Sequence, residues 1–341
     1  MIKFDKKINK IFEYWLTITL LLVFSTIIIG GLTRLTDSGL SITRWELFTG
    51  IIPPLNESDW LKYFSLYKMI PQYELINKDM SLEDFKIIYY WEYIHRIIGR
   101  IIGLFFLIPL LYFHFSKRIE KKYMLPCYFI FILIVVQGIV GWYMVKSGLV
   151  NEVTVSHYRL SLHLLLALII ISTTFWVLMN KLMMTYKKFF IFNKENFFFL
   201  FLIFLIFFQV VLGAFVSGLD AGKIYQTWPM MGQSYFPNDF VGLKFISFFD
   251  FNNHSLIQFY HRNMAYILTI YIIFFSFFIY DKSRPKMFIH IILINIFLIL
   301  QISLGILTLV SNLNIYIASA HQITSVLLVL ASINLYYRHI K

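Results

Sequence analysis

Apolar residues along this chain gather into eight long runs that polar segments separate. A helix needs roughly 20 residues to cross a hydrocarbon core about 30 Å thick, and each run is long enough to do so. The sequence therefore predicts an all-α polytopic membrane protein with eight transmembrane helices. These cover residues 14–33, 94–115, 123–145, 160–180, 195–217, 259–280, 287–310 and 315–337.

The second of these helices is predicted to begin well before its apolar run. Ser81 is a favourable N-cap residue, and Glu83 and Asp84 follow it in the first turn. We therefore expect this helix to start outside the bilayer and to lead into the stretch "EYIHR" at residues 92–96.

Composition supports a membrane protein. Of 341 residues, 59% are hydrophobic, 19% aromatic and only 14% charged, and the mean hydropathy is +0.72. Soluble domains carry a larger charged fraction. The single cysteine, Cys127, excludes an internal disulfide and a cysteine-ligated metal or iron–sulfur centre.

The formal net charge of +12 is explained by topology and gives no reason to expect a nucleic-acid partner. Basic residues concentrate in segments 3–10, 117–122, 181–194, 282–286 and 338–341, which lie on one side of the predicted membrane. By the positive-inside rule this side is cytoplasmic, and so are both termini. The two longest loops, about 34–90 and 218–256, then face outward.

The two halves of the chain repeat one another, which predicts two tandem pseudo-symmetric four-helix bundles. An even number of helices in each half gives a parallel duplication, unlike the inverted repeats of many transporters. We place the halves at residues 1–190 and 191–341. The matching pairs are Gly30 with Gly213, Asp37 with Asp220, Gly39 with Gly222, Trp45 with Trp228, Pro54 with Pro237, His95 with His261, Arg96 with Arg262, Gln137 with Gln301, Gly141 with Gly305, and His163 with His321.

Four histidines lie near the outer ends of the even-numbered predicted helices: His95, His163, His261 and His321. Even-numbered helices run in the same direction, so the two histidines of each half can meet at one membrane depth. Polar residues at that depth usually mark function or internal pairing. Paired imidazoles in an apolar bundle suit axial ligation of heme iron. Zinc would need further donors, and a di-iron centre would need a second Glu-x-x-His motif.

The other histidines fit this pattern less well. His114, His290 and His339 lie at cytoplasmic helix ends, and His254 falls in the second long loop. His157 is an alternative partner for His95, because an ungapped alignment sets it against His321. We prefer His163, because the apolar run that follows it matches the run after His321.

Three arginines lie at the outer ends of predicted helices. Arg96 and Arg262 each follow a paired histidine, and Arg34 ends the first helix. Their guanidinium groups are placed to pair with heme propionates. Snorkelling to the interface is the alternative, and for Arg96 an ion pair with Glu92 is another.

The first half carries a carboxylate that the second half lacks. Glu92 lies three residues before His95 on the same helical face, and Gln258 takes its place before His261. A carboxylate accepts protons and stabilises developing positive charge, whereas an amide does neither near neutral pH. The repeated Asp-x-Gly…Trp segments of the outer loops are predicted to fold over the hemes.

An ordered set of motifs on these helices resembles the heme A synthase family, in its mitochondrial and alphaproteobacterial branch. The motifs are "GGLTRLTDSGLSITRW", "EYIHRIIGR", "HYRLSLHLLLAL", "GAFVSGLDAG…WPMMG", "QFYHR" and "ASAHQ". His157 stands where relatives commonly have proline, and the outer-loop cysteine pair of another branch is absent.

The resemblance implies an enzyme of the bacterial inner membrane that oxidises the C8 methyl of heme O to the formyl group of heme A, for cytochrome oxidase. It implies a heme b cofactor on His261 and His321, a substrate site between His95 and His163, and Glu92 as the essential acid. Such an oxidation needs a redox cofactor and an external electron-transfer partner. Heme O synthase is the expected source of substrate, and a homo-oligomer is compatible with the sequence.

Two other functions compete with this one. A di-heme b-type membrane cytochrome would explain four histidines but not the presence of Glu92 in one half only. A transporter or heme exporter fits poorly with a parallel repeat that has no central ionisable pathway.

Overall fold

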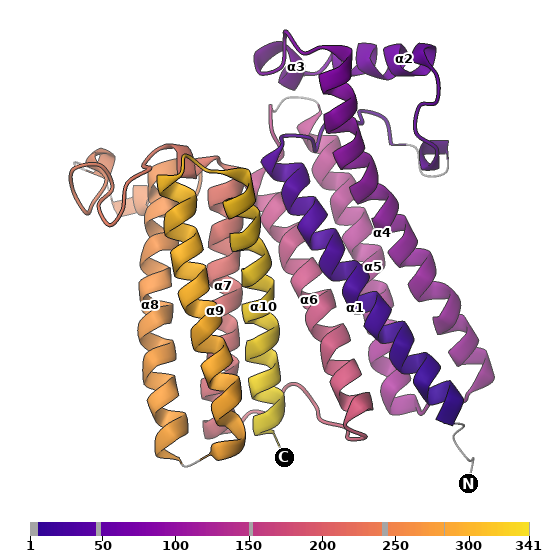
Figure 1. Cartoon of the computed structure of the whole chain (residues 1–341), viewed down its shortest axis with the longest axis vertical. Coiled ribbons are helices and arrows are strands. Elements are labelled where there is room, and N and C mark those ends of the chain that lie inside the picture. Colours follow the sequence, from indigo (N-terminus) through magenta and orange to yellow (C-terminus); the bar gives the residue numbers. More distant parts are fainter. Residues whose placement is uncertain (1–5, 46–48, 150–152, 241–244, 283, 341) are drawn as a thin grey trace. The chain divides into compact units, whose positions relative to one another are not determined.

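The computed structural model describes residues 6–45, 49–149, 153–240, 245–282 and 284–340 (Figure 1). The chain divides into two compact units, Met1–Leu182 and Met183–Lys341. The division falls in the segment that joins the fourth and fifth long helices, a few residues before the predicted boundary at 190. Residues 3–5, 283 and 341 of the predicted basic segments lie outside the described residues.

Unit 1 is a bundle of four long helices. They are α1 (Lys6–Leu35), α4 (Leu82–Ser116), α5 (Lys121–Gly148) and α6 (His157–Leu182). Helix α1 packs along both α4 and α6, and α5 packs along α6, whereas α4 and α5 share a smaller contact. The short elements η1 (Thr49–Ile51), α2 (Glu57–Tyr67) and α3 (Pro71–Leu75) lie between α1 and α4.

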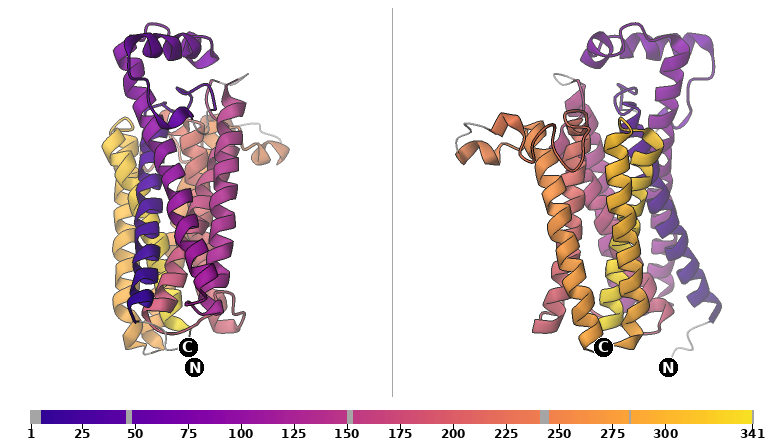
Figure 2. Two further views of the ribbon diagram at one scale, coloured as in Figure 1. Left: turned by 90° about the vertical axis from the view of Figure 1, so that its right-hand side faces the viewer. Right: turned by 60° about the vertical axis from the view of Figure 1, so that its left-hand side comes forward.

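Unit 2 is a second four-helix bundle, visible from two further directions in Figure 2. Its helices are α7 (Lys194–Gly218), α8 (His254–Asp281), α9 (Pro285–Val310) and α10 (Ile315–His339). The α7–α8 connection holds only 3-10 turns among its described residues, η2 (Ala221–Lys223), η3 (Asn238–Phe240) and η4 (Phe245–Phe249). The described residues contain no β-strand, only an isolated bridge between Met231 and Ser234.

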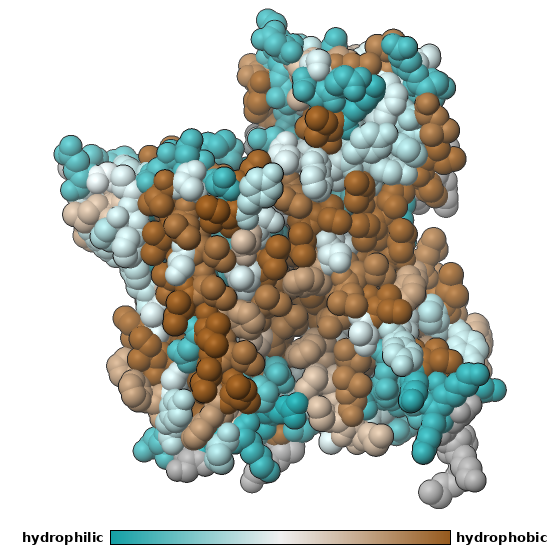
Figure 3. Space-filling model, viewed as in Figure 1, coloured by the Kyte–Doolittle hydropathy of each residue, from teal (hydrophilic) through white to brown (hydrophobic). Residues whose placement is uncertain are grey.

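The eight long helices are apolar enough to cross a membrane, so the prediction of an all-α polytopic membrane protein is confirmed. In each unit the apolar side chains cover the middle of the helices, and polar ones gather at the two ends (Figure 3). Most of the helices extend beyond their predicted apolar runs. Helix α1 begins at Lys6 and α4 at Leu82, because polar residues continue a helix wherever water can solvate their side chains.

The predicted start of α4 is confirmed. Ser81 Oγ accepts a hydrogen bond from the Asp84 backbone N–H at 3.2 Å, and the Asp84 carboxylate accepts one from the Ser81 backbone N–H, also at 3.2 Å. This reciprocal capping box satisfies backbone donors that a helix N-terminus otherwise leaves unpaired.

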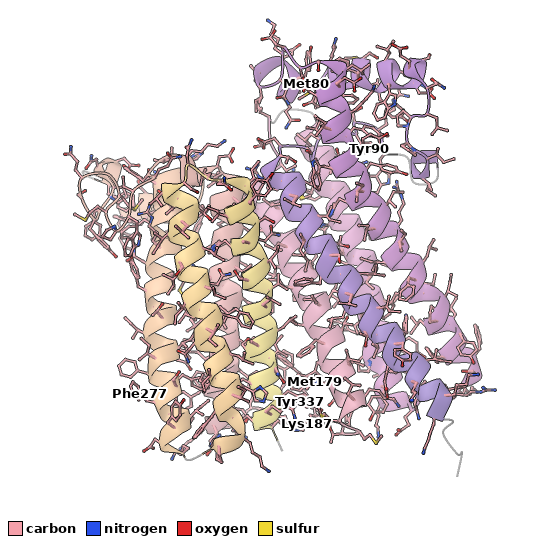
Figure 4. All side chains as sticks on the ribbon, in the orientation of Figure 1. Met80, Tyr90, Met179, Lys187, Phe277 and Tyr337 are labelled. Atoms are coloured by element: carbon pink, nitrogen blue, oxygen red, sulfur yellow. The ribbon has the colours of Figure 1, made fainter. Side chains whose placement is uncertain are left out.

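A helical cap covers the long-loop end of unit 1. Its core, the cap cluster, joins α2 and the loop after α1 to the first turns of α4; Met80 and Tyr90 mark this region in Figure 4. Buried polar groups inside the cap are paired: the Tyr67 hydroxyl contacts Gln72 Oε1 at 3.0 Å and accepts from Asn77 Nδ2 at 2.7 Å. The cap cluster consists of Leu40, Ile42, Trp60, Phe64, Tyr67, Ile70, Phe85, Ile88 and Tyr89.

The turns after α1 and α7 have the same backbone conformation at aligned positions. Asp37 and Asp220 both have φ of +51°, in the left-handed region that aspartate enters more readily than most residues. Each carboxylate also pairs with a nearby cation, Arg34 at 2.8 Å and Lys223 at 3.3 Å. The chain therefore leaves the first helix of each unit by a closely similar route.

Candidate functional site

Each unit brings two of the predicted histidines together inside its bundle. The ring centroids of His95 on α4 and His163 on α6 lie 6.4 Å apart, with 68° between the ring planes. In unit 2, His261 on α8 and His321 on α10 are also 6.4 Å apart, with planes at 89°.

This spacing fits axial ligation of one iron by two imidazoles. Metal–imidazole bonds are about 2 Å long, so two rings bound to opposite sides of an iron place their centroids roughly 6 Å apart. A heme supplies the remaining donors from its own porphyrin. The described residues hold no cluster of three or more histidine, cysteine or carboxylate side chains for a bare metal ion. The histidine pairs therefore suit heme better than zinc or a di-iron centre.

A glycine on a neighbouring helix makes room for each of the four rings. A Cβ added at Gly30 would lie 2.8 Å from the His95 ring, and one at Gly141 would lie 3.0 Å from the His163 ring. The same test at Gly213 and Gly305 gives 3.1 Å to the rings of His261 and His321. Contacts this short are sterically disfavoured, so only glycine leaves these rings in place.

Glutamine side chains hold three of the histidine backbones. Gln137 donates to the carbonyl of His163 at 3.0 Å, Gln301 to that of His321 at 2.6 Å, and Gln209 to that of His261 at 3.1 Å. Gln209 Nε2 also lies 3.1 Å from His261 Nδ1. Such outer contacts fix the orientation of ligand histidines. Thr26 replaces Gln209 in the repeat, so His95 is held differently.

Glu92 lies one turn before His95 and is 3% exposed. One carboxylate oxygen accepts from Ser41 Oγ at 2.7 Å and from the Ile42 backbone N–H at 2.8 Å. The other pairs with Arg96 at 2.5 Å. The ion pair that the sequence offered as an alternative is therefore present, and two further donors hold the buried charge.

Gln258 occupies the matching place in unit 2 with the opposite polarity. Its Nε2 donates to the carbonyl of Tyr225 at 2.8 Å, at the position that aligns with Ile42. Its Oε1 is buried and has no hydrogen-bond partner among the described residues. The acid in unit 1 accepts from a loop N–H, and the amide in unit 2 donates to a loop carbonyl.

The arginines tie the outer loops to the helices that carry the histidines. Arg96 donates to the carbonyl of Ile42 at 3.0 Å, and Arg262 donates to the carbonyls of Tyr225 and Thr227, each at 2.9 Å. Arg34 pairs with Asp37 of its own turn. Binding of propionates by these three arginines stays a prediction.

The remaining histidines lie apart from the two pairs. His157 is buried at the first turn of α6, against the ring of Tyr158 at 4.1 Å. The ring paired with His95 is that of His163. His254 begins α8, so its placement in the loop was wrong; Asn253 caps this helix through its side chain and starts it earlier than the apolar run suggests.

Sequence reasoning missed several residues that shape the site. Ser41 and Gln209 were not singled out, because the repeat pairs them with the different residues Ile224 and Thr26. The four glycines and Gln137 with Gln301 stood out only as matching positions. A repeat that conserves glycine opposite histidine was the signal for their packing role.

Comparison with known proteins gives the same family as the sequence motifs. Residues 13–333 match the profile described as "Cytochrome oxidase assembly protein" (COX15-CtaA). The chain belongs to this family. Among curated members, a heme A synthase of Pelagibacter ubique is 47% identical over 331 residues, which cover 97% of both chains.

Other members of the family are also similar along most of their length. A heme A synthase of Rickettsia bellii is 39% identical over 316 residues, covering 92% of this chain and 94% of its own. One of Parvibaculum lavamentivorans is 42% identical over 260 residues, covering 76% and 75%. The family match spans both histidine pairs and Glu92.

Proposed function

We propose that this protein is a heme A synthase that oxidises the C8 methyl of heme O to a formyl group in two successive oxidations. The observation that carries the proposal is a buried carboxylate that stands beside one histidine pair and is replaced by an amide beside the other. In both units the ring centroids of two histidines lie 6.4 Å apart. Only in unit 1 does a buried carboxylate, that of Glu92, lie one helical turn from a histidine of the pair. The names and near full-length similarity of the curated relatives support it.

In this proposal His261 and His321 hold a resident heme b, and His95 and His163 hold the substrate heme. A heme supplies reversible one-electron chemistry at its iron, which no side chain of this chain provides. The four glycines keep the imidazoles seated, and Gln209 and Gln301 hold the helices of the cofactor pair.

Glu92 is the proposed proton acceptor for the methyl oxidation. Loss of electrons from a methyl carbon releases protons, and a nearby carboxylate takes them up or stabilises positive charge. Ser41, Ile42 and Arg96 hold this carboxylate in one orientation. Gln258 cannot take up a proton in this way, so unit 2 is suited to electron transfer only.

The setting follows from the same proposal. The protein is a multi-pass protein of the bacterial inner membrane with both termini in the cytoplasm. It takes heme O from heme O synthase, passes electrons to an external partner, and supplies cytochrome oxidase. The competing function is a di-heme b-type cytochrome without chemistry of its own, for which Glu92 has no role.

Extraction of hemes from the purified protein tests the proposal. Wild-type protein is expected to contain heme b together with heme O and heme A, whereas a simple cytochrome would contain heme b alone. Glu92→Gln is expected to retain heme b and heme O and to lower heme A at least tenfold, since acid–base groups contribute about 10²–10⁴ in rate. Glu83→Gln, on the exposed first turn of α4, is the control. Unchanged heme A in Glu92→Gln would exclude the proposed role.

A further inference from the structure

A cavity of about 230 Å³ opens beside the Glu92–Arg96 pair in unit 1, between the long-loop ends of α4 and α5. Arg96 lines it from α4, Trp45 from the loop after α1, and Trp142 and Lys146 from α5. It lies along the α4–α5 seam, where the neighbouring helices of this bundle share their smallest contact.

Two cations and two indole rings meet in this cavity. The Arg96 guanidinium lies 5.3 Å from the centroid of Trp45, and Lys146 Nζ lies 5.0 Å from that of Trp142. The aromatic rings hold both cations through cation–π contacts, and hold their stems over apolar surface. The cavity therefore combines two positively charged groups with apolar and aromatic side chains.

Unit 2 repeats Arg96 as Arg262 and Trp45 as Trp228 but lacks the other cation and the other indole ring. The offset that relates Gln137 to Gln301 (301 − 137 = 164) sets Ile306 against Trp142 and Val310 against Lys146. The second cation and its aromatic support are thus present only in the half that carries Glu92.

The leucine that aligns with a cavity-lining residue of unit 1 packs against the turn after α7 in unit 2. The same offset sets Leu313 against Leu149, which lines the cavity in unit 1. A Cβ built on Gly222 would lie 2.8 Å from Leu313 Cδ2, whereas one built on the matching Gly39 meets nothing within 4 Å. Leu313 packs onto Gly222 in the turn after α7, whereas no described side chain packs onto Gly39 in this way.

We propose that this cavity binds the propionate carboxylates of the substrate heme, with Lys146 as the residue that adds specificity to Arg96. The inference rests on the proposed function and extends it. Carboxylates pair strongly with guanidinium and ammonium groups, and an amphipathic porphyrin matches a charged rim above an apolar seam.

The assignment also explains why the acid lies where it does. On heme O the C8 methyl and one propionate are substituents of the same pyrrole ring. A propionate held at Arg96 and Lys146 therefore brings this methyl to the side of the porphyrin that faces Glu92, the ion-pair partner of Arg96. The cavity sets the orientation of the substrate in the histidine pair.

Hemin binding tests the proposal. Purified full-length protein, with its resident heme, is titrated with hemin and with hemin dimethyl ester in phosphatidylcholine nanodiscs, and bis-histidine ligation is followed by the Soret band. Lys146→Met is expected to raise the Kd for hemin about fivefold, roughly 1 kcal/mol, and to leave the Kd for the ester unchanged. Lys146→Arg should keep the wild-type preference for hemin.

Lys62→Met is the matched control, because it removes the same charge from an exposed site on the cap of the same unit. It should change neither Kd. Equal effects of Lys146→Met on hemin and ester, or no effect on either, would overturn the proposal.

Two additional titrations distinguish a propionate site from a lipid-phosphate site and from a failure of the substrate site itself. If phosphatidylglycerol weakens hemin binding in wild type but not in Lys146→Met, the cavity is a lipid-phosphate site and the proposal is overturned. Hemin uptake that His95→Ala does not reduce would instead refute the substrate site of the proposed function. If uptake depends on His95 but hemin and ester bind equally well, only the role of the cavity fails.

Discussion

At the scale of single residues, the histidine sites depend on what stands opposite each ring. An imidazole in a membrane bundle needs space beside a neighbouring helix as well as a ligand. Gly213 and Gly305 provide that space in unit 2, and Gly30 and Gly141 provide it in unit 1. Each histidine of the two pairs therefore lies against a glycine that leaves room for its ring.

Substitution of one such glycine should remove one heme selectively. Gly213→Ala adds a Cβ 3.1 Å from the His261 ring. This distance is too short for ordinary packing, so the ring must shift. Overpacking of this kind costs about 1–3 kcal/mol. We expect resident heme b to fall several-fold, measured as the pyridine hemochrome per protein.

The control for this variant is Gly103→Ala on α4, where an added Cβ meets nothing within 4 Å. It should retain full heme content, and alanine also favours the helix. Equal heme loss in both variants would show that the substitutions disturbed helix packing in general and not the contact between Gly213 and the His261 ring.

At the scale of elements, α4 joins the membrane bundle to the cap of unit 1. Its capped first turn and the cap cluster fix the direction in which the helix enters the bundle. The residues of the site follow along the same helix, with Glu92 before His95 and Arg96. One continuous helix therefore links the helical cap of unit 1 to Glu92.

Removal of the Ser81 N-cap should destabilise only the first turn of α4. Ser81→Ala removes the hydroxyl of the capping box, which costs about 1 kcal/mol. Hydrogen exchange of the amides in residues 82–86 should become roughly fivefold faster. Ser65→Ala, at an exposed position on α2, should leave these amides unchanged. Unchanged exchange in Ser81→Ala would mean that the cap cluster alone holds the turn.

The helical cap of unit 1 should become less stable at high pH, because Tyr67 ionises there. Burial raises the pKa of Tyr67 above its usual 10.0, opposed by the hydrogen bond from Asn77 and reinforced by the charges of Asp37 and Glu92. A raised pKa in the folded state means that the stabilising contribution is complete below pH 10 and is lost as pH rises through the folded pKa.

Tyr67→Phe loses the hydroxyl contacts, which should lower the free energy of unfolding at pH 8 by about 1 kcal/mol. Its Tm at this pH should therefore lie below that of the wild type. The difference in Tm between the two proteins should shrink as pH rises from 9 to about 11.5. A constant difference over this interval would show that Tyr67 does not ionise there.

At the scale of the whole molecule, two units of similar construction carry different polar residues beside the same histidine pair. Both units have four long helices, a pair of histidines and a glycine against each histidine ring. The carboxylate of Glu92 and the cavity with Lys146 belong to unit 1, and Gln258 with the leucine packed against Gly222 belongs to unit 2. Under the proposed function, unit 2 holds the resident heme and unit 1 holds the heme that is oxidised.

This division predicts opposite heme contents for two alanine variants. His261→Ala should lose heme b because one of its axial ligands is gone, whereas His95→Ala should keep heme b and lose bound heme O and heme A. Extracted hemes separated by chromatography check both outcomes. Loss of heme b in His95→Ala with retention in His261→Ala would reverse the assignment of the two sites.

The sequence alone determined the eight membrane helices, the start of α4 at Ser81 and the choice of the four histidines. These follow from local pattern: apolar run length, N-cap chemistry and a repeat that can be aligned by eye. It also identified Glu92 and Gln258 as the difference between the halves, because the comparison needs no coordinates.

Only the tertiary structure decided what each polar group contacts. Three sets of contacts join residues far apart in the chain: His163 with His95, Glu92 with Ser41 and Ile42, and each histidine ring with its glycine. The turns at Gly39 and Gly222 share the pattern Asp-x-Gly, but only Gly222 has a leucine side chain packed against it. Packing between helices distinguishes them, because it depends on side chains that local patterns along the chain do not bring together.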